Sequence, residues 1–256
     1  MQQGGTTPHS PAIPIKRETM KNKILLTITL TLVAAVGLYL LMNARCYQLI
    51  GDLVCHGAND HKHIALTFDD APSEHTSDAV LAVLAEKNVK ATFFMIGENM
   101  ARHPQAAQRI AAAGHELGNH SYSHRRFLLR SPAFIAREIE DTNALIRAAG
   151  YHGPIHFRPP YGKKLLGLPW YLARHHITTV MWDSEPARQQ PPTAEAITAA
   201  ALAQAHNGAI ILLHPFCPDA CRAEREALPH IIDGLRAQGY TLVTVSTLLT
   251  PQPENP

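Results

Sequence analysis

Residues 63–70 read HIALTFDD, an apolar run that ends in two adjacent carboxylates, Asp69 and Asp70. The run predicts a strand that is buried on both faces of a sheet. The aspartates that follow predict reactive groups at the carboxyl end of that strand. The alternative is a helix N-cap and turn, a role that one aspartate can fill and that rarely needs two.

The pattern of this strand recurs along the chain. Six further runs predict strands, at 90–96, 115–119, 155–157, 178–182, 209–213 and 241–245. Helical periodicity occupies the segments 76–87, 104–113, 131–149, 193–205 and 222–238. Strands that alternate with helices indicate a parallel α/β fold, either a barrel or an open doubly wound sheet. No GxGxxG or GxxxxGK[ST] sequence follows a strand, which disfavours a nucleotide-binding version.

Polar side chains follow the carboxyl ends of five predicted strands. They are Asp69, Asp70, His120, His124, Arg158, Asp183 and His214. Barrel enzymes build their active sites at that end of their strands, whereas an open sheet gathers its ligands at one switch point. We therefore expect a distorted (β/α) barrel of about seven parallel strands. One transmembrane helix, predicted from the apolar stretch at 24–42, is expected to precede the barrel.

Two histidines carry the spacing of a metal site. His120 and His124 stand at i and i+4, which places both imidazoles on one face of a helical turn. A carboxylate from another element would complete a three-ligand site with an open position for water. Adjacent aspartates on an extended backbone point apart, so one can bind metal while the other takes a proton from water. The alternative is a pair of surface histidines in a chain that has 16 of them.

In their order, these motifs resemble the polysaccharide deacetylases of the NodB-homology type, also called carbohydrate esterase family four. The resemblance extends from residue 63 to residue 245. The motifs that carry it are Thr67-Phe-Asp-Asp70, Ala91-Thr-Phe-Phe-Met-Ile-Gly97, Gly114-His-Glu-Leu-Gly-Asn-His120, His120-Ser-Tyr-Ser-His124, Arg158-Pro-Pro-Tyr-Gly162, the segment around Trp182-Asp183, and Leu212-Leu-His214.

The resemblance implies a division of labour at the predicted site. Asp69 corresponds to the general base and His214 to the general acid. Asp70, His120 and His124 correspond to the ligands of one divalent metal ion. Zn2+ is the first choice for this ion, and Co2+, Ni2+ and Mn2+ are also compatible with two histidines and one aspartate.

Four further residues correspond to supporting groups of the family. Arg158 is similar to the arginine that orients the base, and Asp183 to the carboxylate that steers the catalytic histidine. The backbone N–H of Tyr161 corresponds to a donor to the oxyanion, and Leu212 to a residue that lines the acetyl methyl pocket.

The sequence departs from the family pattern in two places. Ala71 stands where a glycine usually follows the two aspartates. The fourth motif, usually Asp-x-x-Asp-Trp, reads Asp183-Ser-Glu-Pro-Ala187 and lacks the second aspartate and the tryptophan. Glu185 either replaces the missing carboxylate or is an exposed loop residue, and the second reading is favoured.

An uncharged apolar stretch of 19 residues, at 24–42, precedes the body of the chain. As a helix it would be about 28 Å long, which is enough to cross a bilayer. A cleaved signal peptide is the alternative, because Met20 and the basic residues after it resemble a second start. The stretch exceeds a usual signal h-region, and no cleavage site or lipobox precedes Cys46.

The charges around this stretch predict its orientation. Four basic residues precede it and only Arg45 follows directly, so we expect the N-terminus in the cytoplasm. The protein would then be a single-pass protein of the bacterial cytoplasmic membrane whose catalytic domain faces the periplasm or exterior. The expected organisation is a cytoplasmic tail (1–23), the anchor (24–42), a linker (43–62), the deacetylase domain (63–250) and a C-terminal tail (251–256).

The four cysteines are expected outside the cytoplasm, where thiols can pair. Three connectivities are possible, and the local pairs Cys46–Cys55 and Cys217–Cys221 are favoured. Four free thiols in a reduced compartment are the alternative, and a zinc site is less favoured still.

These observations predict a metal-dependent hydrolase that removes N-acetyl, or O-acetyl, groups from an envelope or extracellular polysaccharide. The expected partners are the acetylated glycan and the membrane, with no obligate protein partner. After Arg45 the chain is near neutral, without the basic surplus that nucleic-acid binding would require. The alternatives are a deacylase of a lipid-linked sugar, a silent carbohydrate-binding domain and a membrane scaffold for envelope enzymes.

Overall fold

The computed structural model describes residues 5, 15–58, 61–188 and 193–250, and contacts divide the chain into the units Met1–Leu40 and Leu41–Pro256. Most of helix α1 (Ile15–Asn43) belongs to the first unit. Its stretch Met20–Asn43 is long and apolar enough to cross a membrane. Of the predicted tail at 1–23, residues 15–23 are helical. Residues 1–4 and 6–14, like the predicted tail at 251–256, lie outside the described residues.

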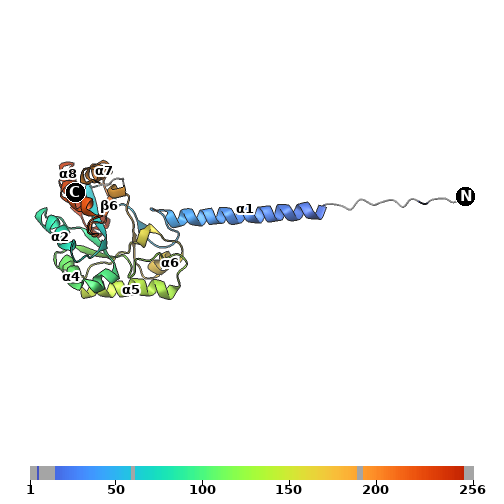
Figure 1. Cartoon of the computed structure of the whole chain (residues 1–256), viewed down its shortest axis with the longest axis horizontal. Coiled ribbons are helices and arrows are strands. Elements are labelled where there is room, and N and C mark those ends of the chain that lie inside the picture. The colour runs from blue at the N-terminus through green and yellow to red at the C-terminus, as the bar shows by residue number, and fades with distance from the viewer. Residues whose placement is uncertain (1–4, 6–14, 59–60, 189–192, 251–256) are drawn as a thin grey trace, which may run out of the picture. The chain divides into compact units, whose positions relative to one another are not determined.

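The second unit is built around a parallel sheet (Figure 1). Its order is β4 (Glu116–Asn119), β3 (Thr92–Met95), β2 (His63–Ala71) and β6 (Ile210–Leu213). β7 (Thr241–Val243) pairs with the first residues of β2, and β1 (Leu53–Val54) pairs with β5 (Thr179–Val180).

Single-residue bridges close this sheet into a ring. Phe157 bridges Asn119 of β4 to Thr179 of β5, and Ser184 bridges to Ile211 of β6. The result is the distorted α/β barrel that the sequence predicted. The predicted strand at 155–157 contributes only the bridge at Phe157, because the prolines that follow Arg158 have no N–H to continue a ladder.

The helices surround the strands and largely follow the sequence prediction. The predicted ones are α2 (Ser77–Glu86), α4 (Pro104–Ala112), α5 (Pro132–Ala148), α7 (Ala194–Ala203) and α8 (Arg222–Ala237). The structure adds α3 (Gly97–Arg102), α6 (Gly167–Arg174), α9 (Val245–Leu249) and the 3-10 turns η1 (Pro160–Gly162) and η2 (Pro186–Arg188). Helix α6 was not predicted because it contains Gly167 and Pro169, yet both lie in its first turn, where proline is tolerated.

The alternation of side chains along β2 determines where Asp69 points. Ile64, Leu66 and Phe68 join one large apolar cluster with residues of the surrounding helices, whereas Ala65 belongs to a second cluster on the other face. Because side chains alternate along a strand, Asp69 shares the inner face with Ala65. The strand therefore directs this carboxylate into the barrel.

Residues 43–62, predicted as a linker, carry β1 and a disulfide between Cys46 and Cys55. A second disulfide joins Cys217 to Cys221, before helix α8. These are the two pairs that the sequence favoured. The domain boundaries themselves stay a prediction.

Low pH should lower the free energy of unfolding through protonation of His115. This side chain is buried, and its Nδ1 accepts the backbone N–H of Ala91 at 3.3 Å, which only an unprotonated nitrogen can do. Burial and the nearby Lys90 lower the pKa of His115 to about 4. The folded protein binds a proton at His115 less readily than the unfolded chain does. The contribution of this neutral side chain to the free energy of unfolding is therefore complete above the ordinary histidine pKa of about 6.5. The contribution decreases by about 3 kcal/mol as the pH falls toward 4.

Denaturant unfolding of the metal-free protein in detergent, over this pH range, measures the effect. His115→Gln should show a flatter pH dependence than the wild type. The exposed His152→Gln serves as the matched control and should follow the wild type. Equal slopes in His115→Gln and wild type would contradict this account.

Candidate active site

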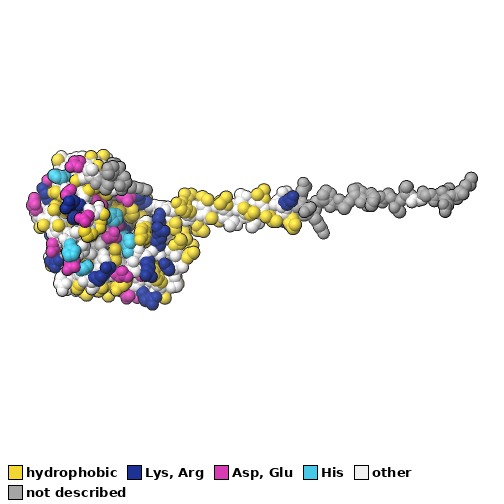
Figure 2. Space-filling view, in the orientation of Figure 1, with side chains coloured by type: hydrophobic (Ala, Val, Ile, Leu, Met, Phe, Trp, Pro, Cys, Tyr) yellow, Lys and Arg dark blue, Asp and Glu magenta, His cyan; other side chains and the backbone are white. Residues whose placement is uncertain are grey.

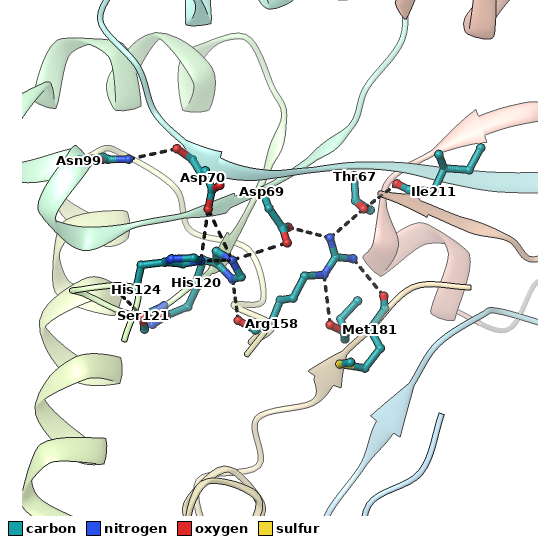
Figure 3. Close-up of polar contacts among 12 residues, drawn as sticks. Thr67, Asp69, Asp70, Asn99, His120, Ser121, His124, Arg158, Met181 and Ile211 are labelled. Atoms are coloured by element: carbon teal, nitrogen blue, oxygen red, sulfur yellow. Dashed lines mark hydrogen bonds and ion pairs between the residues drawn. The ribbon is translucent and has the colours of Figure 1, made fainter. Parts of the chain in front are cut away.

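Three side chains converge at the carboxyl ends of β2 and β4 (Figure 3). One ligand atom from each of Asp70, His120 and His124 lies within 4.8 Å of the other two. The Oδ1 atom of Asp70 lies 3.7 Å from Nε2 of His120 and 3.4 Å from Nε2 of His124. The structure thus brings together the three residues that the sequence named as metal ligands.

The tautomer of His120 follows from its other nitrogen. Nδ1 lies 2.7 Å from the backbone oxygen of Arg158. A carbonyl oxygen only accepts, so Nδ1 carries the proton and Nε2 presents a lone pair. Such a bond to the second nitrogen is typical of metal-binding histidines.

The local backbone at the histidine pair differs from the prediction. Residues 120–124 form no helical turn, because Ser121 and His124 have positive φ angles of 68° and 54°. The loop is held instead by its own side chains, with Asn119 accepting from Ser121 N–H and Ser121 accepting from His124 N–H. The two imidazoles still meet, with their Nε2 atoms 3.2 Å apart.

Left-handed backbone is concentrated at this site. Asp70 and Tyr161 also have positive φ, at 69° and 59°. Non-glycine residues adopt this conformation at a cost, and such residues cluster at functional sites. Ala71, where the family usually has glycine, has no positive φ, so alanine meets no backbone conflict there.

The chemistry of these groups fits a divalent cation. The Oδ1 atom of Asp70 is buried without a hydrogen-bond partner among the described residues, which is costly unless a ligand compensates it. Burial lowers the pKa of His124. His124 is therefore neutral at neutral pH and can offer its lone pair.

Asp69 is held beside these residues by a buried guanidinium. Nη1 of Arg158 donates to Oδ1 of Asp69 at 2.8 Å, while Oδ2 of Asp69 lies 3.6 Å from Nε2 of His120. Burial would raise the pKa of Asp69, but the positive charge of Arg158 and its hydrogen bond favour the ionised carboxylate, and the net effect lowers this pKa. Asp69 is therefore ionised at neutral pH.

Arg158 itself is fully buried, and it donates four hydrogen bonds. In addition to Asp69, it donates to the hydroxyl of Thr67 at 2.9 Å and to the backbone oxygens of Val180 and Met181 at 3.2 and 3.0 Å. Its guanidinium lies 3.9 Å from the ring centroid of Phe94. Arg158 therefore holds Oδ1 of Asp69 and leaves Oδ2 facing His120.

A cavity of about 330 Å³ joins the predicted residues. Asp69, Asp70, both histidines, Tyr161, Leu212 and His214 all line it. His214 follows the end of β6, and its imidazole makes no hydrogen bond or ion pair within the described part of the chain. Tyr161 packs its ring 4.7 Å from that of His124.

Two predicted residues do not line this cavity. Arg158 is buried and acts on it through Asp69, whereas Asp183 has other partners. Its carboxylate pairs with Nε2 of His206 at 2.8 Å and accepts the backbone N–H of Ile210 at 3.0 Å. Ile210 begins β6, whereas His214 follows its end, about 13 Å further along at the rise of a strand. The predicted contact between Asp183 and His214 is therefore wrong.

The structure also places three residues that sequence reasoning missed or misjudged. Trp182 and Glu185 line the cavity, and Nε1 of Trp182 donates to Oε2 of Glu185 at 3.1 Å. Glu185 is half-buried, not the exposed loop residue that the sequence favoured. Glu224, in the first turn of α8, accepts the backbone N–H of His214 at 2.5 Å, and burial raises the pKa of this carboxyl. Nothing in its sequence context distinguishes Glu224 from the other glutamates of that helix.

Comparison with known proteins identifies the family of this chain. The family model for polysaccharide deacetylase matches residues 56–180. The peptidoglycan-N-acetylglucosamine deacetylase of Bacillus cereus is 32% identical over 199 residues, covering 77% of this chain and 72% of that protein. The chitooligosaccharide deacetylase of Rhizobium leguminosarum bv. trifolii is 34% identical over 194 residues, covering 72% of this chain and 90% of that protein. The chain therefore belongs to the polysaccharide deacetylase family.

A solved structure of similar fold shows that the family is not uniformly active. A crystal structure of a pseudoenzyme of carbohydrate esterase family four, from Bacillus anthracis, has a TM-score of 0.71 and 28% identity. The match covers 79% of this chain and 70% of that one. The function of this chain must therefore be argued from its own site residues.

The position of Asp183 leads to a prediction about pH dependence. Asp183→Asn keeps an oxygen for Ile210 but loses the ion pair with His206, which is half exposed. We expect a stability loss of at most about 1 kcal/mol and no movement of the alkaline limb of kcat/KM. His206→Gln should reproduce this behaviour. A limb that moves to lower pH in Asp183→Asn alone would show that Asp183 does govern His214.

Proposed function

We propose that this protein is a metal-dependent hydrolase that removes N-acetyl groups from a glycan of the cell envelope. The observation that carries the proposal is the convergence of Asp70, His120 and His124 beside an ionised, buried Asp69. A cavity brings His214 to the same space. The peptidoglycan and chitooligosaccharide deacetylases to which the chain is similar support the choice of an N-acetylated sugar.

Asp70, His120 and His124 would hold the metal ion, with zinc as the first choice and cobalt, nickel or manganese as alternatives. When bound, such an ion acts as a Lewis acid and lowers the pKa of water. Asp69 then takes the proton of the attacking water on its carboxylate. Because Arg158 holds Oδ1, the free Oδ2 is the oxygen that accepts this proton.

The remaining residues act on the acetyl group and the leaving amine. The backbone N–H of Tyr161 would donate to the oxyanion as the carbonyl carbon becomes tetrahedral. Leu212 would contact the methyl group. As the C–N bond breaks, His214 gives a proton to the amine nitrogen, and acetate and a free amino sugar leave.

Glu224 is proposed as the residue that positions His214, the role that the sequence assigned to Asp183. It acts through the backbone N–H of His214 and not through the imidazole. Its bond fixes the chain at the point where β6 ends and the side chain enters the cavity.

The test is product analysis by mass spectrometry on acetylated glycans, namely peptidoglycan fragments, chitin-like oligomers and acetylated xylan. We expect loss of one acetyl mass per event and release of acetate. Asp69→Asn should keep its metal content and lose at least about 10²-fold in kcat, the scale of general-base catalysis. Asp70→Asn and His120→Ala should lose both metal and activity, since each removes a ligand.

Two outcomes would contradict the proposal in different ways. Metal loss in Asp69→Asn would show that this residue is a ligand and that the assignment of the base is wrong. A protein that binds metal and glycan but releases no acetate from any substrate would be a silent carbohydrate-binding domain.

We further propose that α1 anchors the enzyme in the bacterial cytoplasmic membrane, with the N-terminus inside and the catalytic domain facing the periplasm or exterior. The length and apolarity of Met20–Asn43 support a span. The basic residues before this stretch support the orientation. The two disulfides suit an oxidising compartment.

Reporter fusions test this topology. A reporter that is active only outside the cytoplasm should be active when fused after Arg45. The same reporter fused before Met20 should be silent, and a cytoplasmic reporter should give the reverse pattern. Activity of the outside reporter at the earlier position would overturn the orientation.

A further inference from the structure

Exposed apolar side chains of the second unit gather on three segments. Beyond α1 and apart from Tyr161 at the cavity, the large hydrophobic residues that the structure describes as exposed are Tyr47, Leu49, Leu128, Leu129, Leu166 and Trp170. Leu129 is 91% exposed and Trp170 is 48% exposed. These residues fall within 45–51, 125–130 and 161–174, which we call the arginine-leucine face.

The three segments lie side by side on the barrel. Phe127 shares a buried cluster with Leu168 and Leu172 of α6. A side chain at Gly51 would meet Cβ of Ala173 at 2.8 Å, so the first segment packs on the same helix. The guanidinium of Arg126 lies 5.0 Å from the ring centroid of Tyr161. The exposed groups therefore form one surface.

This surface is basic as well as apolar. Arg125, Arg126, Arg130 and Arg174 are exposed on it. The stretches 41–51, 121–131 and 160–178 contain no aspartate or glutamate. None of these four arginines forms an ion pair within the described part of the chain. Figure 2 shows Lys and Arg side chains beside hydrophobic ones over the region of α6.

The chain enters the second unit at this surface. The backbone N–H of Lys164 donates to the backbone oxygen of Met42 at 3.5 Å, and the Lys163 and Lys164 side chains donate to Asn43 and Ala44. Met42 and Asn43 are the last residues of the apolar helix. A span that ends here would place this surface next to the headgroups of its own bilayer.

We propose that the arginine-leucine face rests on an anionic phospholipid surface. Leucine and tryptophan enter the interface between headgroups and acyl chains, where tryptophan is enriched. The unpaired arginines bind lipid phosphates, to which basic residues close to a membrane are attracted. A protein partner would satisfy the leucines equally well. The position of the face at the end of α1 and the absence of acidic residues from its three segments favour lipid.

Docking would connect the anchor to the active site. Tyr161 belongs to the face and also lines the catalytic cavity. Arg45, Lys163 and Tyr161 line a second cavity of about 390 Å³, which shares Tyr161, Trp182 and Glu185 with the first. If the proposed function holds, the enzyme takes glycan at the membrane surface, where lipid-linked and newly made chains lie.

Tryptophan quenching in the full-length chain tests the docking without reference to activity. The chain has two tryptophans, and Trp182 is only 8% exposed. The protein is reconstituted into bilayers of phosphatidylcholine with brominated acyl chains, with or without phosphatidylglycerol. We expect quenching of the wild type to exceed that of Trp170→Phe when phosphatidylglycerol is present, and the difference to shrink without it or at high salt.

Matched arginine variants separate this face from general charge effects. Arg125→Gln/Arg130→Gln should lose most of the Trp170-dependent quenching. Arg222→Gln/Arg236→Gln removes two exposed arginines of α8 and should behave as wild type. All variants should hydrolyse a soluble acetylated oligomer at the wild-type rate, so a failure of the proposed function would appear in that assay alone.

Three results would overturn the proposal. One is equal quenching in wild type and Trp170→Phe. Another is Trp170-dependent quenching that is the same with and without phosphatidylglycerol. The third is protection of Trp170 from aqueous acrylamide by a soluble polyuronate but not by phosphatidylglycerol vesicles. That result would make the face an acidic-glycan site.

Discussion

The buried ion pair between Arg158 and Asp69 is the constraint on which the rest of the site depends. Removing two charges from water costs several kcal/mol per ion, and only good geometry with further hydrogen bonds repays it. Here the guanidinium binds Asp69, Thr67 and the backbone oxygens of Val180 and Met181. Those partners belong to β2 and to the chain at and after β5, so the barrel must close correctly for the pair to form at all.

The same residue couples the proposed base, Asp69, to the candidate metal ligands. The side chain of Arg158 fixes Asp69, while its backbone oxygen fixes the tautomer and the ring of His120. A displacement of Arg158 would therefore disturb the position of Asp69 and the ring orientation of His120. The left-handed backbone at Asp70, Ser121, His124 and Tyr161 is strain around this centre, and the buried network stabilises it.

The sequence predicted the parts of this structure that depend on strand periodicity. The apolar run at 63–68 does form the central strand with Asp69 near its end. The expectation that Asp69 and Asp70 point apart was wrong, because Asp70 has a left-handed φ of 69° and both carboxylates lie near Nε2 of His120, at 3.6 and 3.7 Å. The spacing of His120 and His124 identified two side chains that do meet, although the predicted helical turn was wrong. The histidines are four positions apart in either backbone, and the side chains of Asn119 and Ser121 hold the loop that forms instead of the helical turn.

The prediction for Asp183 was wrong because sequence position after an apolar run does not reveal where a strand lies in the barrel. Regular pairing in β5 ends at Val180, and the chain then runs past the beginning of β6. Trp182 and Glu185 reach the cavity from this irregular segment, which no periodicity describes. The cavity residues of this irregular segment could therefore be identified only from the three-dimensional structure.

In the proposed mechanism, the backbone of His214 and not its ring is held by a carboxylate. In a pair with a carboxylate, an imidazole is oriented through its ring and favours its charged form. His214 has no such partner within the described residues, and Glu224 holds its backbone instead. A backbone bond fixes where the side chain begins but leaves the ring free to rotate. In the proposed mechanism, the leaving amine would therefore help to orient the ring, and proton transfer from His214 would depend on the fit of the sugar.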